Sequence, residues 1–240
     1  MEATALCRKL SELRVPATLS LAGRVARPKR HTLPTRIGGF GGIDGLRTYL
    51  SAERITHVID ATHPFAQQMS VNAIAACKQI GLPLVALTRP PWRATEADQW
   101  HCVPDIAGAV AALDRPKTRV MLAIGRMHLA AFAPRPQHHY LLRLVDPPKE
   151  ALSLPDTTVI VDRGPFSIEG DLALMRAHAI ELVVSKNAGG TGAAAKLAAA
   201  RALGLPVIMI DRPPIPNRPE VHDTDAALHW LARHGADLGV

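Results

Sequence analysis

A glycine-rich turn between an apolar run and an alanine-rich run constrains the fold of this chain more than any other segment. Residues 180–184 are largely apolar, the turn at 185–192 reads Ser-Lys-Asn-Ala-Gly-Gly-Thr-Gly, and residues 193–203 have a helical composition. A strand that passes through glycines into a helix presents unpaired N–H groups and a partial positive charge. The segment therefore predicts a phosphate or carboxylate site at the edge of an α/β sheet. We expect the anion to contact Lys186, Asn187, Gly189, Gly190 and Thr191.

Strand and helix patterns alternate along the rest of the chain. Apolar strands joined by amphipathic helices predict parallel sheets with helices on both faces, the α/β class. The expected strands cover residues 17–22, 57–61, 84–88, 120–124, 140–145, 159–162, 182–185 and 207–210. The expected helices cover residues 43–53, 66–80, 106–113, 167–179, 193–203 and 224–234.

The charge balance changes in the middle of the chain, where Arg-Pro-Pro-Trp at 89–92 interrupts the pattern. Residues 1–96 hold 13 Lys and Arg against 6 Asp and Glu, whereas residues 97–240 hold 15 of each. We therefore expect two α/β lobes, residues 1–96 and 97–240, with a ligand-binding cleft between them.

The first residues have a helical pattern, with Leu6, Leu10 and Leu13 on one face. A domain of this type normally begins with a strand, and that strand is usually central. We therefore expect the first strand of the N-terminal lobe to be missing from this sequence. Either the natural chain starts earlier, or the strand is supplied in another way.

The composition argues against several classes of protein. No apolar run approaches the roughly 20 residues that span a bilayer, and no signal-peptide pattern opens the chain. Cys7, Cys77 and Cys102 are odd in number and far apart, which predicts buried thiols, no disulfide and a cytoplasmic location. No metal-ligand spacing is present, so no metal is expected.

A basic run in the first lobe predicts either a solvated loop or a site for a polyanion. Its members share a stretch of thirteen positions without an acid: Arg24, Arg27, Lys29, Arg30 and Arg36. Aromatic residues make up only 4% of the chain and none lies in this run, which argues against nucleic acid. Arg24 follows a strand where an acid often binds ribose, and a basic residue there suits a 2′-phosphate or a substrate carboxylate.

Two further motifs lie at expected strand ends or helix starts. The cluster Gly-Gly-Phe-Gly-Gly at 38–42 predicts a backbone nest in which Gly39 and Gly41 contact a ligand. The motif Asp-Ala-Thr-His-Pro-Phe-Ala at 60–66 places His63 and Phe65 at the binding edge, with Thr62 or His63 expected to cap the next helix. His63 could donate to a carboxylate or move a proton.

Arg89 and Trp92 follow the strand at 84–88. Their side chains could line the cleft or close their lobe by packing. Ser167 is expected to cap the helix at 167–179.

Taken in order, these motifs resemble the precorrin-6A reductase family of cobalamin biosynthesis. The resemblance covers residues 2 to about 213 and is carried by the ordered set of motifs. Its motifs are Ala-Gly-Arg at 22–24, the clusters at 38–42 and 60–66, Gly-Pro-Phe-Ser at 164–167, Lys-Asn-x-Gly-Gly at 186–190 and Asp-Arg-Pro at 211–213.

The resemblance implies two Rossmann-like lobes and an NADPH-dependent reduction of one double bond of precorrin-6A, or of cobalt-precorrin-6A, to precorrin-6B. Members usually open with a strand ending in Gly-Gly-Thr, which this sequence lacks, and Ala188 stands where serine is common. The implied cofactor contacts are Lys186, Asn187, Gly189, Gly190, Thr191, Gly39 and Gly41. The implied contacts to the corrinoid polycarboxylate are Arg24, Arg27, Arg36, His63, Phe65 and Arg89.

No catalytic residue is assigned, and His63 is the candidate for the proton donor. We expect a monomer or small homo-oligomer that binds neither nucleic acid nor membrane. Two alternatives stay open: a nucleotide-sugar or methyl transferase with a similar cleft, and a basic nucleic-acid-binding module centred on residues 24–36.

Overall fold

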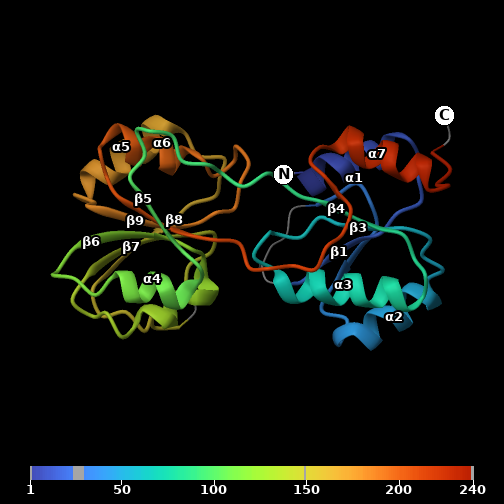
Figure 1. The fold of residues 1–240 in the computed structure, drawn as a ribbon, viewed down its shortest axis with the longest axis horizontal. Helices are drawn as coiled ribbons and strands as arrows, with labels where there is room; N and C mark the ends of the chain where they lie inside the picture. Colours follow the sequence, from blue (N-terminus) through green and yellow to red (C-terminus); the bar gives the residue numbers. More distant parts are fainter. Residues whose placement is uncertain (1, 24–29, 149, 239–240) are drawn as a thin grey trace. The chain divides into compact units, whose positions relative to one another are not determined.

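The computed structural model describes residues 2–23, 30–148 and 150–238. The chain divides into two compact units (Figure 1). Unit 1 contains Met1–Pro90 and Pro214–Val240, and unit 2 contains Pro91–Pro213. Every strand pairing within the three sheets is parallel, which confirms the α/β class.

The elements follow the expected alternation closely. Unit 1 contains α1 (Glu2–Glu12), β1 (Leu19–Leu21), β2 (Thr35–Ile37), α2 (Gly42–Ala52), β3 (Val58–Asp60), α3 (Gln67–Gln79), β4 (Leu84–Leu87), β11 (Glu220–Val221) and α7 (Thr224–Arg233). Unit 2 contains β5 (Trp100–Val103), α4 (Ile106–Ala112), β6 (Arg119–Ala123), the 3-10 helix η1 (Arg126–Phe132), β7 (His139–Leu144), β8 (Thr157–Val161), α5 (Ile168–Ala177), β9 (Leu182–Lys186), α6 (Ala195–Ala202) and β10 (Val207–Ile210).

Unit 1 is a layered structure with helices on both faces of its strands. Leu6 and Leu10 of α1 pack with Leu231 of α7 and Leu87 of β4 in one core cluster. A second cluster joins α2 and α3 below the strands, as Figure 1 shows, with Leu46 among its buried members. The apolar face expected for the first helix therefore forms part of the core.

The strands of unit 1 form two separate sheets, β1–β2 and β11–β4–β3. In the described ranges, no strand joins the β1–β2 pair to the three-stranded sheet.

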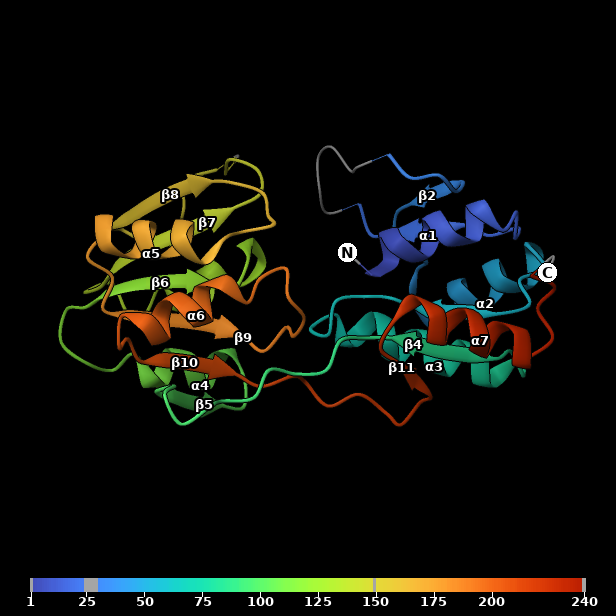
Figure 2. The same cartoon turned by 90° about the horizontal axis from the view of Figure 1, so that it is seen from above.

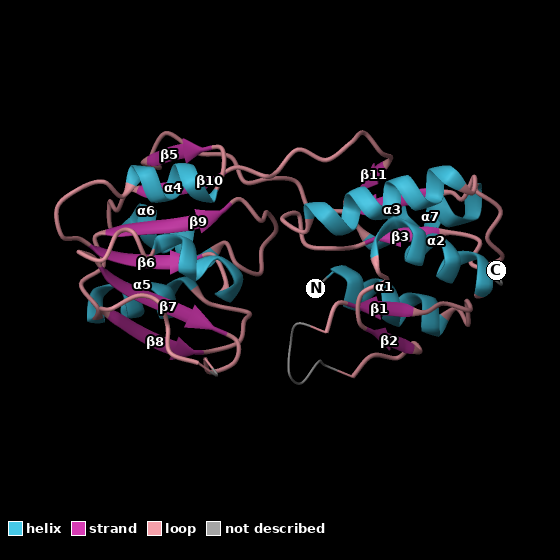
Figure 3. Cartoon of the chain, turned by 90° about the horizontal axis from the view of Figure 1, so that it is seen from below, coloured by secondary structure: helices cyan, strands magenta, loops and turns pink. Residues whose placement is uncertain are grey.

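Unit 2 contains a six-stranded sheet in the order β5-β10-β9-β6-β7-β8 (Figure 3). Its central strands are almost wholly buried because α5 and α6 cover one face and α4 covers the other (Figure 1). Met121, Val183 and Met209 form the centre of this core. Ser167 accepts a hydrogen bond from the Gly170 N–H at 3.0 Å, which confirms the predicted cap of α5.

The observed grouping differs from the expected division at residue 96. β11 pairs with β4, through Glu220 opposite Ala86 and Val221 opposite Leu87, and Figure 2 shows the two strands side by side. α7 packs on α1, so residues 214–240 belong to the first unit rather than the second. β11 has only two residues and pairs with a distant part of the sequence, so no local pattern indicates it.

None of the helices in the described ranges is long and apolar enough to span a bilayer.

Candidate functional site

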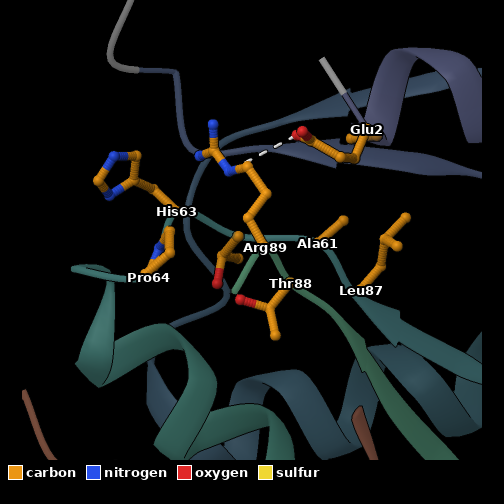
Figure 4. Close-up of a pocket in the computed structure, with 9 residues that line it drawn as sticks. Glu2, Ala61, His63, Pro64, Leu87, Thr88 and Arg89 are labelled. Carbon is orange, nitrogen blue, oxygen red and sulfur yellow. Dashed lines mark ion pairs between the residues drawn. The ribbon is translucent and has the colours of Figure 1, made fainter. Parts of the chain in front are cut away.

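A pocket of about 220 Å³ opens at the carboxyl ends of β3 and β4 in unit 1 (Figure 4). Thr62 and His63 line it from the loop after β3, Thr88 and Arg89 from the end of β4, and Glu2 from the start of α1. Parallel strands bring their carboxyl ends to one edge of a sheet, and two motifs distant in the sequence therefore meet here. The pocket brings together the predicted contacts His63 and Arg89.

Arg89 forms an ion pair with Glu2 across the pocket (Figure 4). The Arg89 Nε lies 3.8 Å from the Glu2 Oε2, and the two side chains are 19% and 27% exposed. Burial raises the pKa of the Glu2 carboxyl, but the lowering effects, among them a backbone hydrogen bond and the charge of Arg89, are larger together, so the pKa is lowered overall. The sequence did not single out Glu2, because nothing local links it to Arg89.

His63 is exposed at the rim of the pocket, and its Nδ1 accepts a hydrogen bond from the Phe65 N–H at 3.2 Å. In the neutral ring, this bond places the proton on Nε2. The Phe65 ring lies 5.8 Å from the His63 ring, so these two predicted contacts are neighbours.

The loop between β3 and α3 is anchored by a buried carboxylate. Asp60 accepts hydrogen bonds from the Thr62 N–H at 3.1 Å, from the Thr62 hydroxyl at 2.7 Å and from the Ser70 hydroxyl at 2.7 Å, and it pairs with Arg218. α3 begins after Ala66 without a side-chain cap, so the prediction that Thr62 or His63 caps it is wrong. Thr62 binds Asp60 instead, which fixes the backbone beside His63.

The glycine cluster at 38–42 is held on its carbonyl side by Arg36. The Arg36 guanidinium donates to the Gly38 and Gly39 carbonyls, both at 2.6 Å, and lies 3.9 Å from the centre of the Phe40 ring. Among the described residues, the N–H groups of residues 39–42 have no acceptor. These N–H groups and the start of α2 are suited to an anion.

The glycine-rich turn after β9 has the same character in unit 2. Within the described part of the chain, no N–H group of residues 189–193 donates to an acceptor. Gly189 and Gly190 have φ angles of 69° and 73°, a conformation that glycine adopts without strain. Turns of this kind followed by a helix bind phosphates through successive N–H groups.

The carbonyl side of this turn is occupied by donors from elsewhere in unit 2. The Trp92 indole N–H donates to the Gly190 carbonyl at 2.8 Å, and the Trp92 backbone exchanges two hydrogen bonds with the Asn187 side chain at 2.7 and 3.0 Å. Arg212 donates to the Asn187 carbonyl at 2.9 Å and to the Ala188 carbonyl at 3.2 Å. Trp92 therefore packs within unit 2, whereas the sequence placed it in the first lobe, either lining the cleft or closing that lobe.

The structure therefore divides the predicted site residues among three places. The pocket of unit 1 contains His63 and Arg89 with Phe65 beside it; Gly39 and Gly41 lie in the cluster that Arg36 holds; and Lys186, Asn187, Gly189, Gly190 and Thr191 form the turn of unit 2. Arg24 and Arg27 lie outside the described residues. The described ranges contain no group of three His, Cys, Asp or Glu that could hold a metal ion.

Comparison with known proteins gives consistent results. A family model described as precorrin-6x reductase CbiJ/CobK matches residues 1–232. Precorrin-6A reductase of Rhodobacter capsulatus is 55% identical over 235 residues, covering 98% of this chain and 94% of the relative. Precorrin-6A reductase of Rhodococcus erythropolis is 45% identical over 232 residues, covering 96% and 93%.

A solved structure of CobK precorrin-6A reductase is 55% identical in sequence. It superposes with a TM-score of 0.96 and covers 100% of this chain and 96% of that chain. The ordered motifs, the fold and the family model agree, and the chain belongs to the precorrin-6x reductase family.

Proposed function

We propose that this protein reduces one double bond of the precorrin-6A macrocycle with NADPH, giving precorrin-6B in cobalamin biosynthesis. The relatives named above are precorrin-6A reductases, which supports the substrate. The observation that carries the cofactor assignment is the row of N–H groups at residues 189–193 without an acceptor among the described residues. A pyrophosphate offers the oxygens that such a row would bind.

The cofactor contacts in this proposal are the turn of unit 2 and the glycine cluster of unit 1. Lys186 contributes a positive charge where β9 ends, and Thr191 contributes a hydroxyl where the turn approaches α6. Asn187, Gly189 and Gly190 shape the turn between them. Gly39 and Gly41 offer a second set of N–H groups, which suits another anionic group of the cofactor or the substrate.

The substrate contacts in this proposal are the pocket of unit 1 and the basic residues of its first part. A pocket of about 220 Å³ is too small for a tetrapyrrole, so it would receive one carboxylate-bearing side chain of the ring. Arg89 is placed to bind that carboxylate in exchange for Glu2. Arg24 and Arg27 would bind further carboxylates, and Phe65 would contact the apolar ring.

NADPH supplies a hydride to the conjugated ring when it is bound. The protein's own part is to orient the ring, exclude water and let one proton reach it. His63 is our candidate for moving that proton, because its Nε2 carries the proton when Nδ1 accepts from Phe65. We also propose a cytoplasmic location, consistent with the three cysteines being unpaired.

The test is an anaerobic assay of the purified protein with precorrin-6A and NADPH. We expect the nicotinamide absorbance to fall while the spectrum of the corrinoid shifts. One mole of NADPH should be oxidised for each mole of corrinoid reduced. Parallel reactions with NADH and with cobalt-precorrin-6A identify the preferred cofactor and substrate. An absence of turnover with both corrinoids overturns the proposal, and binding of S-adenosylmethionine or a sugar nucleotide in place of NADPH would indicate a transferase.

A further inference from the structure

Lys196 is a buried cation beside the glycine-rich turn of unit 2. It lies in the first turn of α6 and is only 5% exposed. Lysine is seldom buried this deeply without a reason, because moving an ammonium group out of water is costly. Burial is also the main cause that lowers its pKa to about 8, with the positive charge of Arg143 contributing in the same direction.

The carboxylate that acts electrostatically on Lys196 is already paired with another cation. Asp171 raises the pKa of Lys196 slightly, yet Asp171 forms an ion pair with Arg143, which also stacks on the Phe166 ring at 3.5 Å. No ion pair of Lys196 occurs within the described residues. The lysine is therefore not retained for a salt bridge.

The contacts that Lys196 does make converge on the turn. Its Nζ donates to the Ala193 carbonyl at 2.6 Å and lies 4.8 Å from the centre of the Trp92 ring. Trp92 in turn donates its indole N–H to the Gly190 carbonyl and is joined to Asn187 by two hydrogen bonds. One ammonium group thus supports the turn at two points, directly at Ala193 and through the indole at Gly190.

We infer that Lys196 is a positioning residue for the cofactor. It holds the carbonyl side of residues 187–193, so that the N–H groups of these residues stay directed at the ligand. This inference rests on the proposed function, in which NADPH is the ligand of the turn. It gives Lys196 a role without direct contact to the phosphates. Lys186, at the end of β9, is the residue proposed to contact them.

The first experiment measures the dissociation constant of NADPH for Lys196→Met, Lys196→Arg and the control Arg201→Met at pH 7. Arg201 is a cation of the same helix, but it binds Asp98 rather than the turn. We expect Lys196→Met to weaken NADPH binding by about tenfold or more, since a charged hydrogen bond to the turn is lost. Lys196→Arg should recover most of the affinity, while KM for precorrin-6A stays unchanged in both variants. Unchanged NADPH affinity in Lys196→Met, or an equal loss in Arg201→Met, overturns the inference.

The second experiment uses the unaltered protein and is therefore independent of how the variants fold. The charged groups that act on Lys196 are Arg143 of β7 and Asp171 of α5, which form an ion pair with each other. The NADPH dissociation constant should therefore rise as the pH passes about 8 and Lys196 loses its charge. Lys196→Arg should remove that rise, because arginine stays charged. A flat profile in the unaltered protein contradicts the inference.

A third variant separates this inference from the proposed function. Lys186→Met alters a residue proposed to contact the phosphates themselves. If Lys186→Met leaves NADPH affinity unchanged, the proposed cofactor site is wrong. If Lys186→Met weakens NADPH binding and Lys196→Met does not, only the positioning role of Lys196 is wrong.

Discussion

Arg218 forms a buried ion pair with Asp60, although 158 positions separate the two residues in the sequence. Their side chains are only 7% and 1% exposed. Arg218 lies in the segment that leads into β11, and Asp60 ends β3 and anchors the loop that carries His63. The pair therefore links the last part of the chain to the loop that lines the pocket of unit 1.

Replacing Arg218 with Met should destabilise unit 1 strongly, because it leaves the Asp60 carboxylate buried without its cation. The expected loss is about 3–5 kcal/mol, the range for breaking one half of a buried ion pair. Hydrogen–deuterium exchange of peptides from α3 and from residues 60–66 should report faster exchange. The double variant with Asp60→Asn should recover part of the stability, since no unpaired charge then remains. If the single and double variants are equally unstable, the two residues are not coupled.

Arg89→Met should raise KM for precorrin-6A by about tenfold, the effect of losing one charged hydrogen bond to a carboxylate. KM for NADPH should stay within about twofold, which distinguishes a substrate contact from general damage.

Glu2→Gln is the matched variant on the other side of the same ion pair. It removes the carboxylate that competes with the substrate for Arg89, so KM for precorrin-6A should fall by a few-fold. An increase in KM would mean that Glu2 aids substrate binding and would contradict the proposed exchange.

The stability of the protein should rise with pH above about 8 because of Lys196. Its folded pKa of about 8 lies below the ordinary 10.5, so the unfolded chain binds more protons than the folded one between these values. The free energy of unfolding, compared with that of Lys196→Met, should therefore increase from pH 8 to 10.5, by up to about 3 kcal/mol. Denaturant unfolding at pH 7, 9 and 10 measures this. A difference that stays constant over the range would show that Lys196 does not titrate there.

The three thiols should differ in their reactivity toward Ellman's reagent. Cys102 is exposed on β5, whereas Cys7 and Cys77 are buried at 5% and 2%. Burial, together with the charge of Asp60, raises the pKa of Cys77 to about 11, which suppresses its thiolate. We expect one reactive thiol in the native protein and three in urea. Fast labelling in a Cys102→Ser variant would contradict this.

The sequence predicted the elements whose patterns are long and apolar, and missed those that depend on distant partners. Runs such as 120–124 and 207–210 appear as β6 and β10 because a strand buried on both faces needs continuous apolar residues. β2 and β11 have three and two residues and partly exposed side chains, so neither has a recognisable pattern. Their existence depends on pairing with β1 and β4.

The same distinction applies to the candidate site. The turn at 185–192 could be identified because glycines, a strand and a helix are contiguous there. The side chains that hold it could not, since Trp92 and Arg212 come from other segments of unit 2. Lys196 offered one signal, a cation among the alanines at the start of α6, at a position that a helix would bury. Arg36 was expected to contact substrate, and the structure places its guanidinium on the carbonyls of the glycine cluster.

The return of the chain to unit 1 affects the order in which the two units can fold during protein synthesis. The ribosome completes residues 91–213 before it makes β11 and α7, so the six strands of unit 2 are all available earlier than the last elements of unit 1. Domains generally fold as units while the chain is made. Unit 1 is therefore begun first on the ribosome and completed last. The loop that lines its pocket gains its buried ion pair only after Arg218 has been synthesised.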